Sequence, residues 1–152
     1  MSGVIALFGL KNTDKKTLRT FLKENASDMF PRTFKQFFED LNIQIVDLKP
    51  NHSLKDAWDK LSKDEIKLVI YIIDGSDETT FTSAKHEFSK LSRFIKFNKI
   101  PLLILVNKIE LEISPNLITR IIEDFKLCKF VNRKWLVHKI CTKTGDGKKE
   151  CL

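Results

Sequence analysis

Short apolar runs and longer amphipathic stretches alternate along the chain, and polar turns end the apolar runs. The runs at residues 4–8, 66–73 and 100–106 are apolar at nearly every position, which is typical of strands buried on both faces of a parallel sheet. Residues 135–140 are predicted to form the last strand. These segments are therefore expected to make up the centre of the fold.

Segments whose apolar residues recur at helical spacing occupy most of the intervals between these runs. Leu18, Phe21 and Leu22 recur at the spacing of one helix face. Ser53 is a candidate N-cap, and Pro115 stands at the favoured first position of a helix. The predicted helices span residues 16–25, 53–63, 80–96 and 114–125.

Residues 33–38 and 43–48 are predicted to form a hairpin around residues 40–42. Because strands alternate with helices, we expect one α/β domain, residues 1–152, with three layers and a mostly parallel six-stranded sheet. Ligands of such sheets bind beyond the carboxyl ends of the strands. The chemistry is therefore expected at polar strings that directly follow the apolar runs.

Composition excludes several classes of protein without identifying a site. No apolar run approaches the roughly 20 residues that a membrane span needs. Cys128, Cys141 and Cys151 lack metal-ligand spacing, so we expect a reducing, cytoplasmic setting without a disulfide or zinc framework. The net charge of +7 indicates either a solvated lysine-rich surface or attraction to phosphate-bearing partners. No block of Lys and Arg with interleaved aromatic residues predicts a nucleic-acid groove.

The string from Gly9 to Thr17 stands between a predicted strand and a predicted helix, the place of a phosphate-binding loop. Gly9 and Lys15 match the first glycine and the lysine, whereas Asp14 replaces the second glycine and Lys16 the magnesium-binding hydroxyl residue. A carboxylate about 4 Å from a phosphate charge costs on the order of 4 kcal/mol, about a thousandfold in affinity, unless a neighbouring lysine neutralises it. An alternative register uses Lys16 and Thr17 as the lysine–hydroxyl pair, and an ordinary strand–turn–helix connection is a third interpretation. The candidate phosphate-binding residues are Gly9, Asn12, Thr13, Asp14, Lys15, Lys16 and Thr17.

Two later strings have the form of a guanine-reading pair. The candidate base-binding residues are Asn107, Lys108, Glu110, Cys141, Thr142 and Lys143. In the first string Glu110 keeps the carboxylate that accepts from guanine but adds a methylene, and a displacement of that size can cost about a hundredfold. In the second, the N–H of Thr142 is expected to donate to guanine O6, and Lys143 to pack on the base.

These strings together resemble the Arf branch of the Ras-like small GTPases. The segments similar to family motifs are residues 9–17, 45–58, 73–77 and 133–147. In the last of them, Arg133-Lys134-Trp135 and the string from Cys141 to Gly147 match the family's Arg-x-Trp and Cys-Ala-Thr-Ser-Gly-Asp-Gly without a gap. The resemblance implies a P-loop GTPase-like fold that binds GTP or GDP with Mg²⁺ and acts through protein effectors or regulators.

Departures from the family pattern fall on the parts that carry out hydrolysis. By resemblance, Mg²⁺ would be held by Asp47 and Thr33, with Thr17 as the hydroxyl of the alternative register. The Gly-Gly-Gln of the second switch is replaced here by residues 49–51. Pro50 has no N–H with which to sense a γ-phosphate, and the candidate catalytic residue Asn51 is one methylene shorter than the glutamine that orients water. We therefore predict weak or absent GTP hydrolysis.

The two ends of the chain also differ from the family pattern. Ser2 stands where a myristoylated protein needs glycine, so membrane contact is expected to be at most peripheral. Residues 148–152 stand where the family has its last helix. Loss of that helix is predicted to leave an apolar strip on the sheet, covered by a partner or by a second copy of the chain.

Three functional interpretations stay open at this point. The first is an Arf-like, guanine-nucleotide-dependent switch with impaired hydrolysis, favoured by Lys15, Asp47 and Asn107. The second is a pseudo-GTPase, an interaction module without nucleotide, favoured by Asp14 and Pro50. The third is a binder of phosphate-bearing or lipid surfaces, favoured by the net charge alone.

Overall fold

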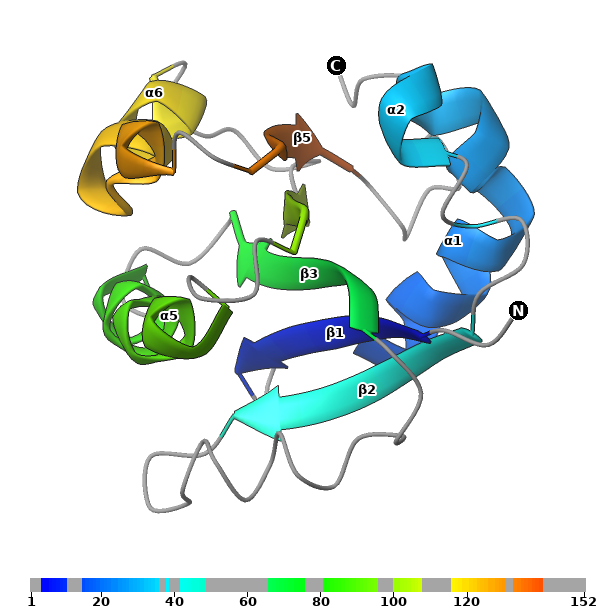
Figure 1. Cartoon of the computed structure of the whole chain (residues 1–152), viewed down its shortest axis with the longest axis horizontal. Helices are drawn as coiled ribbons and strands as arrows, with labels where there is room; N and C mark the ends of the chain where they lie inside the picture. Colours follow the sequence, from blue (N-terminus) through cyan, green and yellow to red (C-terminus); the bar gives the residue numbers. More distant parts are fainter. Residues whose placement is uncertain are drawn as a thin grey trace.

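In the part of the chain that the structure describes, five strands form one sheet with helices on both faces (Figure 1). The computed structural model describes residues 4–10, 15–35, 38, 42–48, 66–75, 81–95, 100–107, 116–130 and 133–140. The strands are β1 (Val4–Leu10), β2 (Asn42–Leu48), β3 (Ile66–Asp74), β4 (Leu102–Asn107) and β5 (Trp135–Lys139). The helices are α1 (Lys15–Met29), α2 (Arg32–Lys35), α5 (Phe81–Ile95), α6 (Leu117–Asp124) and the 3-10 helix η2 (Leu127–Lys129).

All pairings between these strands are parallel, in the order β2-β1-β3-β4-β5. Every residue of β4 is buried, and β3 is buried from Leu68 to Ile73. Strands that are apolar on both faces need cover on both faces, and helices in the connections between parallel strands supply it. The predicted α/β class with a mostly parallel sheet is confirmed.

The hairpin predicted for residues 33–38 and 43–48 is wrong, and with it the sixth strand. Arg32–Lys35 is helical, and β2 pairs in parallel with β1 instead. The N–H of Phe34 donates to the carbonyl of Pro31 at 2.9 Å, which closes the first turn of α2. Phe30, Phe34 and Phe38 are four residues apart, and that spacing places side chains on one face of either a strand or a helix. The apolar pattern therefore could not separate the two.

The other predicted elements appear with shifted ends. The first helix runs four residues further than the predicted 16–25, to Met29. The last described α-helix begins at Leu117 rather than at residue 114. The helix predicted for residues 53–63 lies outside the described residues.

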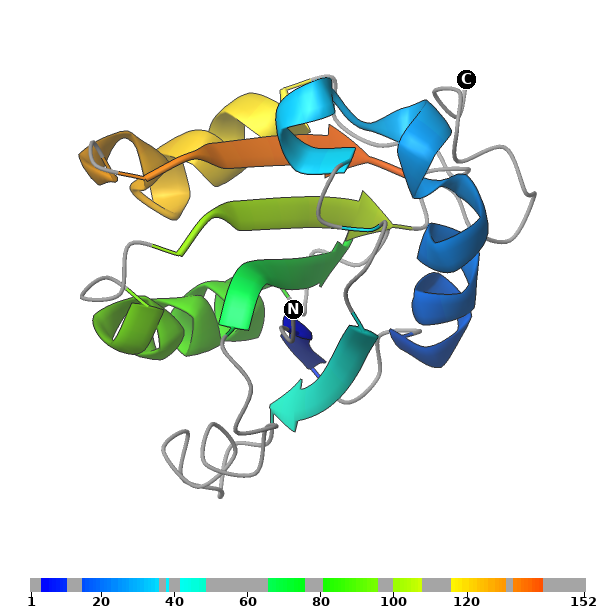
Figure 2. The ribbon, with the colours of Figure 1, turned by 45° about the vertical axis from the view of Figure 1, so that its right-hand side comes forward.

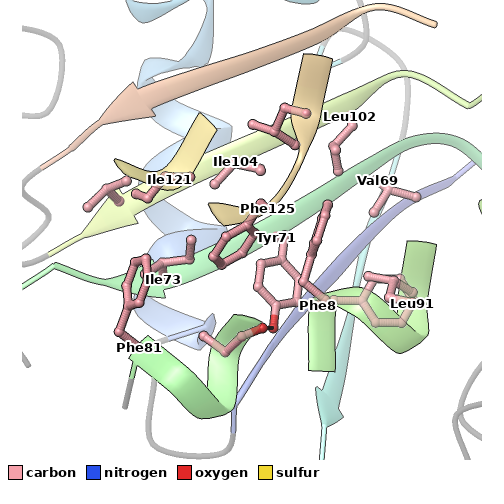
Figure 3. Packing of buried hydrophobic residues seen from close by; sticks show 14 of the residues in the cluster. Phe8, Val69, Tyr71, Ile73, Phe81, Leu91, Leu102, Ile104, Ile121 and Phe125 are labelled. Carbon is pink, nitrogen blue, oxygen red and sulfur yellow. Dashed lines mark hydrogen bonds between the residues drawn. The ribbon is translucent and has the colours of Figure 1, made fainter. Parts of the chain in front are cut away.

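An aromatic cluster fills the core between the sheet, α5 and α6 (Figure 3). The ring of Tyr71 lies 5.2 Å from that of Phe88, and Phe88 lies 4.9 Å from Phe125. The buried hydroxyl of Tyr71 donates to the carbonyl of Ala84 at 2.7 Å. Burial and the nearby Glu87 carboxylate raise the pKa of Tyr71, so the phenol stays a neutral donor.

The opposite face of the sheet is covered by α1 and by residues 30–35 and 38, here called the phenylalanine segment (Figure 2). Phe30 packs 5.5 Å from Phe38 and 5.2 Å from the ring of His138 on β5. Leu103 and Leu105, the β4 residues on this face, belong to the same cluster and have no exposed surface. The apolar strip predicted from the missing last helix is therefore not found at these β4 residues.

Candidate functional site

The carboxyl ends of the strands lie together at one edge of the sheet. Gly9 on β1 is in register with Asp47 on β2, and Asp74 on β3 is in register with Asn107 on β4. Lys139, the last residue of β5, is in register with Val106. The strands that precede the three candidate strings therefore end at the same edge of the sheet, as predicted, whereas most residues of those strings lie outside the described residues. We call this edge the nucleotide edge.

Backbone hydrogen bonds fix the base-side half of this edge. The N–H of Gly75 donates to the carbonyl of Asn107 at 2.8 Å, and the N–H of Ile140 donates to that of Val106 at 2.9 Å. The side chain of Asn107 is buried, with 1% of the residue exposed. The carboxyl ends of β3, β4 and β5 are thus tied to one another. Sequence reasoning did not include Gly75 among the site residues, although a polar Asp-Gly pair at the end of an apolar run marks its place.

Lys15 connects the start of α1 to the end of β1, on the side of the nucleotide edge where phosphate is predicted to bind. Its Nζ donates to the carbonyl of Gly9 at 3.3 Å, and 3% of the residue is exposed. This bond places the ammonium group beside the carboxyl end of β1. Lys16 and Thr17, in contrast, are exposed on the first turn of α1. The geometry favours the register in which Lys15 is the phosphate-binding lysine.

The start of α1 also concentrates positive potential. Lys15 and Lys16 are its first two residues, and its first turn contains no acidic residue. A helix N-terminus already carries partial positive charge, so each lysine there is unfavourable by roughly 0.3–1 kcal/mol. A bound anion reverses this effect, because the positive end of the helix and its lysines are then close to opposite charge. The residues present fit a phosphate group.

The predicted metal ligands are not all brought together. Asp47 lies beside Gly9 in the sheet register, and Thr17 lies on the first turn of α1. Thr33 is exposed on α2, beyond the far end of α1 from Lys15 (Figures 1 and 2). At 1.5 Å per residue, α1 separates its two ends by roughly 20 Å. In this conformation Thr33 cannot share a metal ion with Thr17.

The remaining predicted site residues lie outside the described residues, and their roles stay predictions. They are Asn12, Thr13, Asp14, Asn51, Lys108, Glu110, Cys141, Thr142 and Lys143. Within the described ranges, no group of three or more His, Cys, Asp or Glu side chains is placed to hold a metal ion. None of the helices that the structure describes is long and apolar enough to cross a bilayer.

Comparison with known proteins agrees with this geometry. The sequence profile of the ADP-ribosylation factor (Arf) family matches residues 2–152. The match thus covers the phosphate-side and base-side strings together, including the parts of each string that the structure does not describe. A search among curated proteins finds no match.

Proposed function

The chain belongs to the ADP-ribosylation factor family, and on this premise we propose that it binds guanine nucleotide and hydrolyses GTP weakly or not at all. Members of this family bind GTP or GDP with Mg²⁺ and act with effector or regulator proteins. The observation that carries the proposal is the burial of Lys15, the first residue of α1. Its Nζ donates to the carbonyl of Gly9 on β1. An ordinary strand–turn–helix connection has no need of a buried lysine at this point.

In the proposed complex, the phosphates lie on the N-terminus of α1 beside Lys15, and the base lies beyond Asn107. The burial of Asn107 and the bond from Gly75 to its carbonyl support a fixed carboxyl end of β4 on the base side. Lys108, Glu110, Thr142 and the other base-side candidates would complete the pocket. Mg²⁺ would be held from the side of Asp47 and Thr17, with affinity lowered because Thr33 is distant.

Native mass spectrometry of the purified protein tests nucleotide binding directly. We expect a bound mass equal to GDP or GTP. Thermal unfolding with added GDP, GTP or ATP and Mg²⁺ is the matched measurement, because a ligand at 100 times its Kd adds about 2.7 kcal/mol to the stability of the folded state. A rise in Tm with guanine nucleotides but not with ATP supports the proposal. No bound mass and no shift with either guanine nucleotide would reject it.

Single-turnover measurement of phosphate release tests the hydrolytic part. The Pro50 and Asn51 substitutions remove a γ-phosphate contact and a water-orienting amide, so we expect release far slower than that of an active small GTPase measured in parallel. The double variant Pro50→Gly with Asn51→Gln should be faster than the natural chain. Equal rates for the natural chain and the active GTPase would overturn the prediction.

A pseudo-GTPase without nucleotide is the second candidate, favoured by the carboxylate of Asp14 in the phosphate loop. The isosteric variant Asp14→Asn separates the two proposals. It removes a repulsion on the order of 4 kcal/mol at an effective dielectric constant near 20, about a thousandfold in affinity. Binding gained only in this variant would identify a pseudo-GTPase, whereas binding by both chains supports the switch. Glu123→Gln, at an exposed residue of α6, is the charge-matched control and should change nothing.

The remaining parts of the proposal concern partners and location. We propose that the chain works in the cytoplasm with a protein effector or regulator, without nucleic acid. A second copy or partner on the sheet face beside β5 has little room, because Phe30, Phe34 and Phe38 already pack there with Leu136. Sedimentation equilibrium tests this point: a concentration-dependent dimer would support the partner predicted from the sequence, and a monomer would remove it.

A further inference from the structure

Basic residues are concentrated at the edge of the sheet opposite the nucleotide edge, where the strands begin. Because the strands are parallel, the helices that precede β4 and β5 must end at this opposite edge, where those strands start. The ends of α5 and α6 and the helix η2 lie together at the left of Figures 1 and 2, away from α1. We define the basic pole as the cationic side chains at these ends. They are Lys90, Arg93, Lys126, Lys129, Arg133 and Lys134.

Acidic residues are scarce in the sequences that form this pole. Residues 88–109 and 125–145 contain no Asp or Glu. Lys90 has a partner in Glu87, with Nζ and Oε1 3.5 Å apart, and Glu123 and Asp124 end α6. The exposed side chains of Lys126, Lys129 and Lys134 form no ion pair with any described residue.

Arg133, the first residue of the Arg-x-Trp match, is a member of the pole whose charged atoms are buried. Its Nε, Nη1 and Nη2 atoms are buried, and in the part of the chain that the structure describes none of them has a hydrogen-bond partner. Its guanidinium lies 5.1 Å from the ring centroid of Phe130, which itself packs on Phe88. Burial lowers the pKa of Arg133 to about 10. A buried cation without an anion is unfavourable, and a negatively charged partner would remove that cost.

The backbone at Lys126 shows a second local cost. Lys126 follows α6 with φ 56° and ψ 42°, the left-handed conformation that glycine or asparagine usually takes at a helix end. Lysine at this position projects a further charge from the pole without gaining an ion pair among the described residues. Neither Lys126 nor Arg133 has an ion pair with a described residue that would offset its cost.

We propose that the basic pole binds the phosphate headgroups of an anionic lipid surface. Its cations come from the ends of separate elements at one end of the molecule, an arrangement that matches a plane of charges better than a single extended strand. Trp135 is half-buried and directly follows Lys134, and such a Trp–Lys pair suits the interface between water and lipid. Nucleic acid fits less well, because the ring of Phe130 is occupied by Phe88 and Arg133 and cannot stack on a base.

The placement of the pole makes lipid binding independent of nucleotide. The pole and the nucleotide edge lie at opposite ends of the strands, so a surface contact leaves the nucleotide edge facing away from the lipid. Each cation near an anionic surface contributes about fivefold in the partition constant. The contribution falls steeply with ionic strength, because exposed charges are screened.

Cosedimentation of the full chain with vesicles tests the proposal. The chain should bind vesicles of phosphatidylcholine with phosphatidylserine, bind phosphatidylcholine alone far less, and dissociate as salt is raised. The triple variant Lys126→Gln, Lys129→Gln and Lys134→Gln should bind about a hundredfold less. The control variant Lys23→Gln, Arg32→Gln and Lys85→Gln loses the same charge at exposed residues outside the pole and should bind within about threefold of the natural chain.

Several outcomes would overturn the proposal. Equal losses in the two triple variants would show an effect of net charge and not of the pole. Binding to an acidic polypeptide or to single-stranded RNA without binding to the anionic vesicles would assign the pole to another class of partner. Vesicle binding that needs GDP or GTP would contradict its independence from the nucleotide edge, whatever the result of the nucleotide tests.

Arg133→Met tests the role of the buried cation separately. An apolar side chain of similar length removes an unpaired buried charge, so we expect Tm to stay equal or rise while vesicle binding falls about fivefold. Arg133→Lys keeps the charge and should restore most of the binding. A lower Tm with unchanged vesicle binding would show that Arg133 only supports Phe130, and would contradict its part in the proposal.

Discussion

The nucleotide edge and the phenylalanine segment both contain predicted site residues, yet their side chains are packed differently. At the nucleotide edge, Lys15 and Asn107 are buried and held by hydrogen bonds to or from backbone groups. In the phenylalanine segment, Phe30 and Phe34 are buried in the hydrophobic core, and Thr33 lies exposed on α2. The first region keeps a geometry suited to binding a ligand, and the second is used for packing. Nucleotide binding and switching can therefore be tested separately in this chain.

The largest effect is expected from Lys15→Met. Removing an ammonium group about 4 Å from a phosphate forfeits on the order of 4 kcal/mol at an effective dielectric constant near 20, so affinity for GDP should fall by a hundred- to a thousandfold. Titration of the protein with a fluorescent GDP analogue measures this loss. The matched variant Lys16→Met, at the exposed neighbour, should lose less than tenfold. The reverse order would establish the alternative register of the loop.

The sequence predicts the nucleotide edge better than the phenylalanine segment, and the reason is physical. A run such as residues 102–107, apolar on both faces, has few alternatives to a buried strand. Because the strands pair in parallel, the polar residues at the carboxyl end of this run must then lie at the same edge of the sheet as those of its neighbours. The spacing of Phe30, Phe34 and Phe38 suits helix and strand equally, and only the neighbouring core decides between them. The burial of Lys15 depends on the direction of the Gly9 carbonyl, which no residue pattern encodes.

Phe34→Ala should give the next largest effect, and on stability rather than on nucleotide affinity. Phe34 is 4% exposed and packs in the cluster that covers β4 and β5. Truncation of a buried phenylalanine lowers the free energy of unfolding by roughly 3–5 kcal/mol, measured by urea denaturation. The GDP affinity of the folded variant should stay within about threefold of the natural value. A tenfold or greater fall would show that the two regions are energetically coupled.

The smallest effect is expected from Thr33→Ala, and this variant tests the comparison most directly. Thr33 is exposed, and α1 separates it from Lys15 by roughly 20 Å, so unfolding free energy should change by less than about 0.5 kcal/mol. Affinity for GDP and for GTP with Mg²⁺ should change less than about twofold, because the side chain reaches neither ligand.

A loss of affinity confined to the GTP–Mg²⁺ complex would contradict this expectation. Since α2 must then leave the sheet face to bring Thr33 to the metal, such a loss should grow larger in a Phe34→Ala background, where the loosened α2 releases Thr33 more readily. Absence of any loss in either background would establish that this chain binds nucleotide without its first switch.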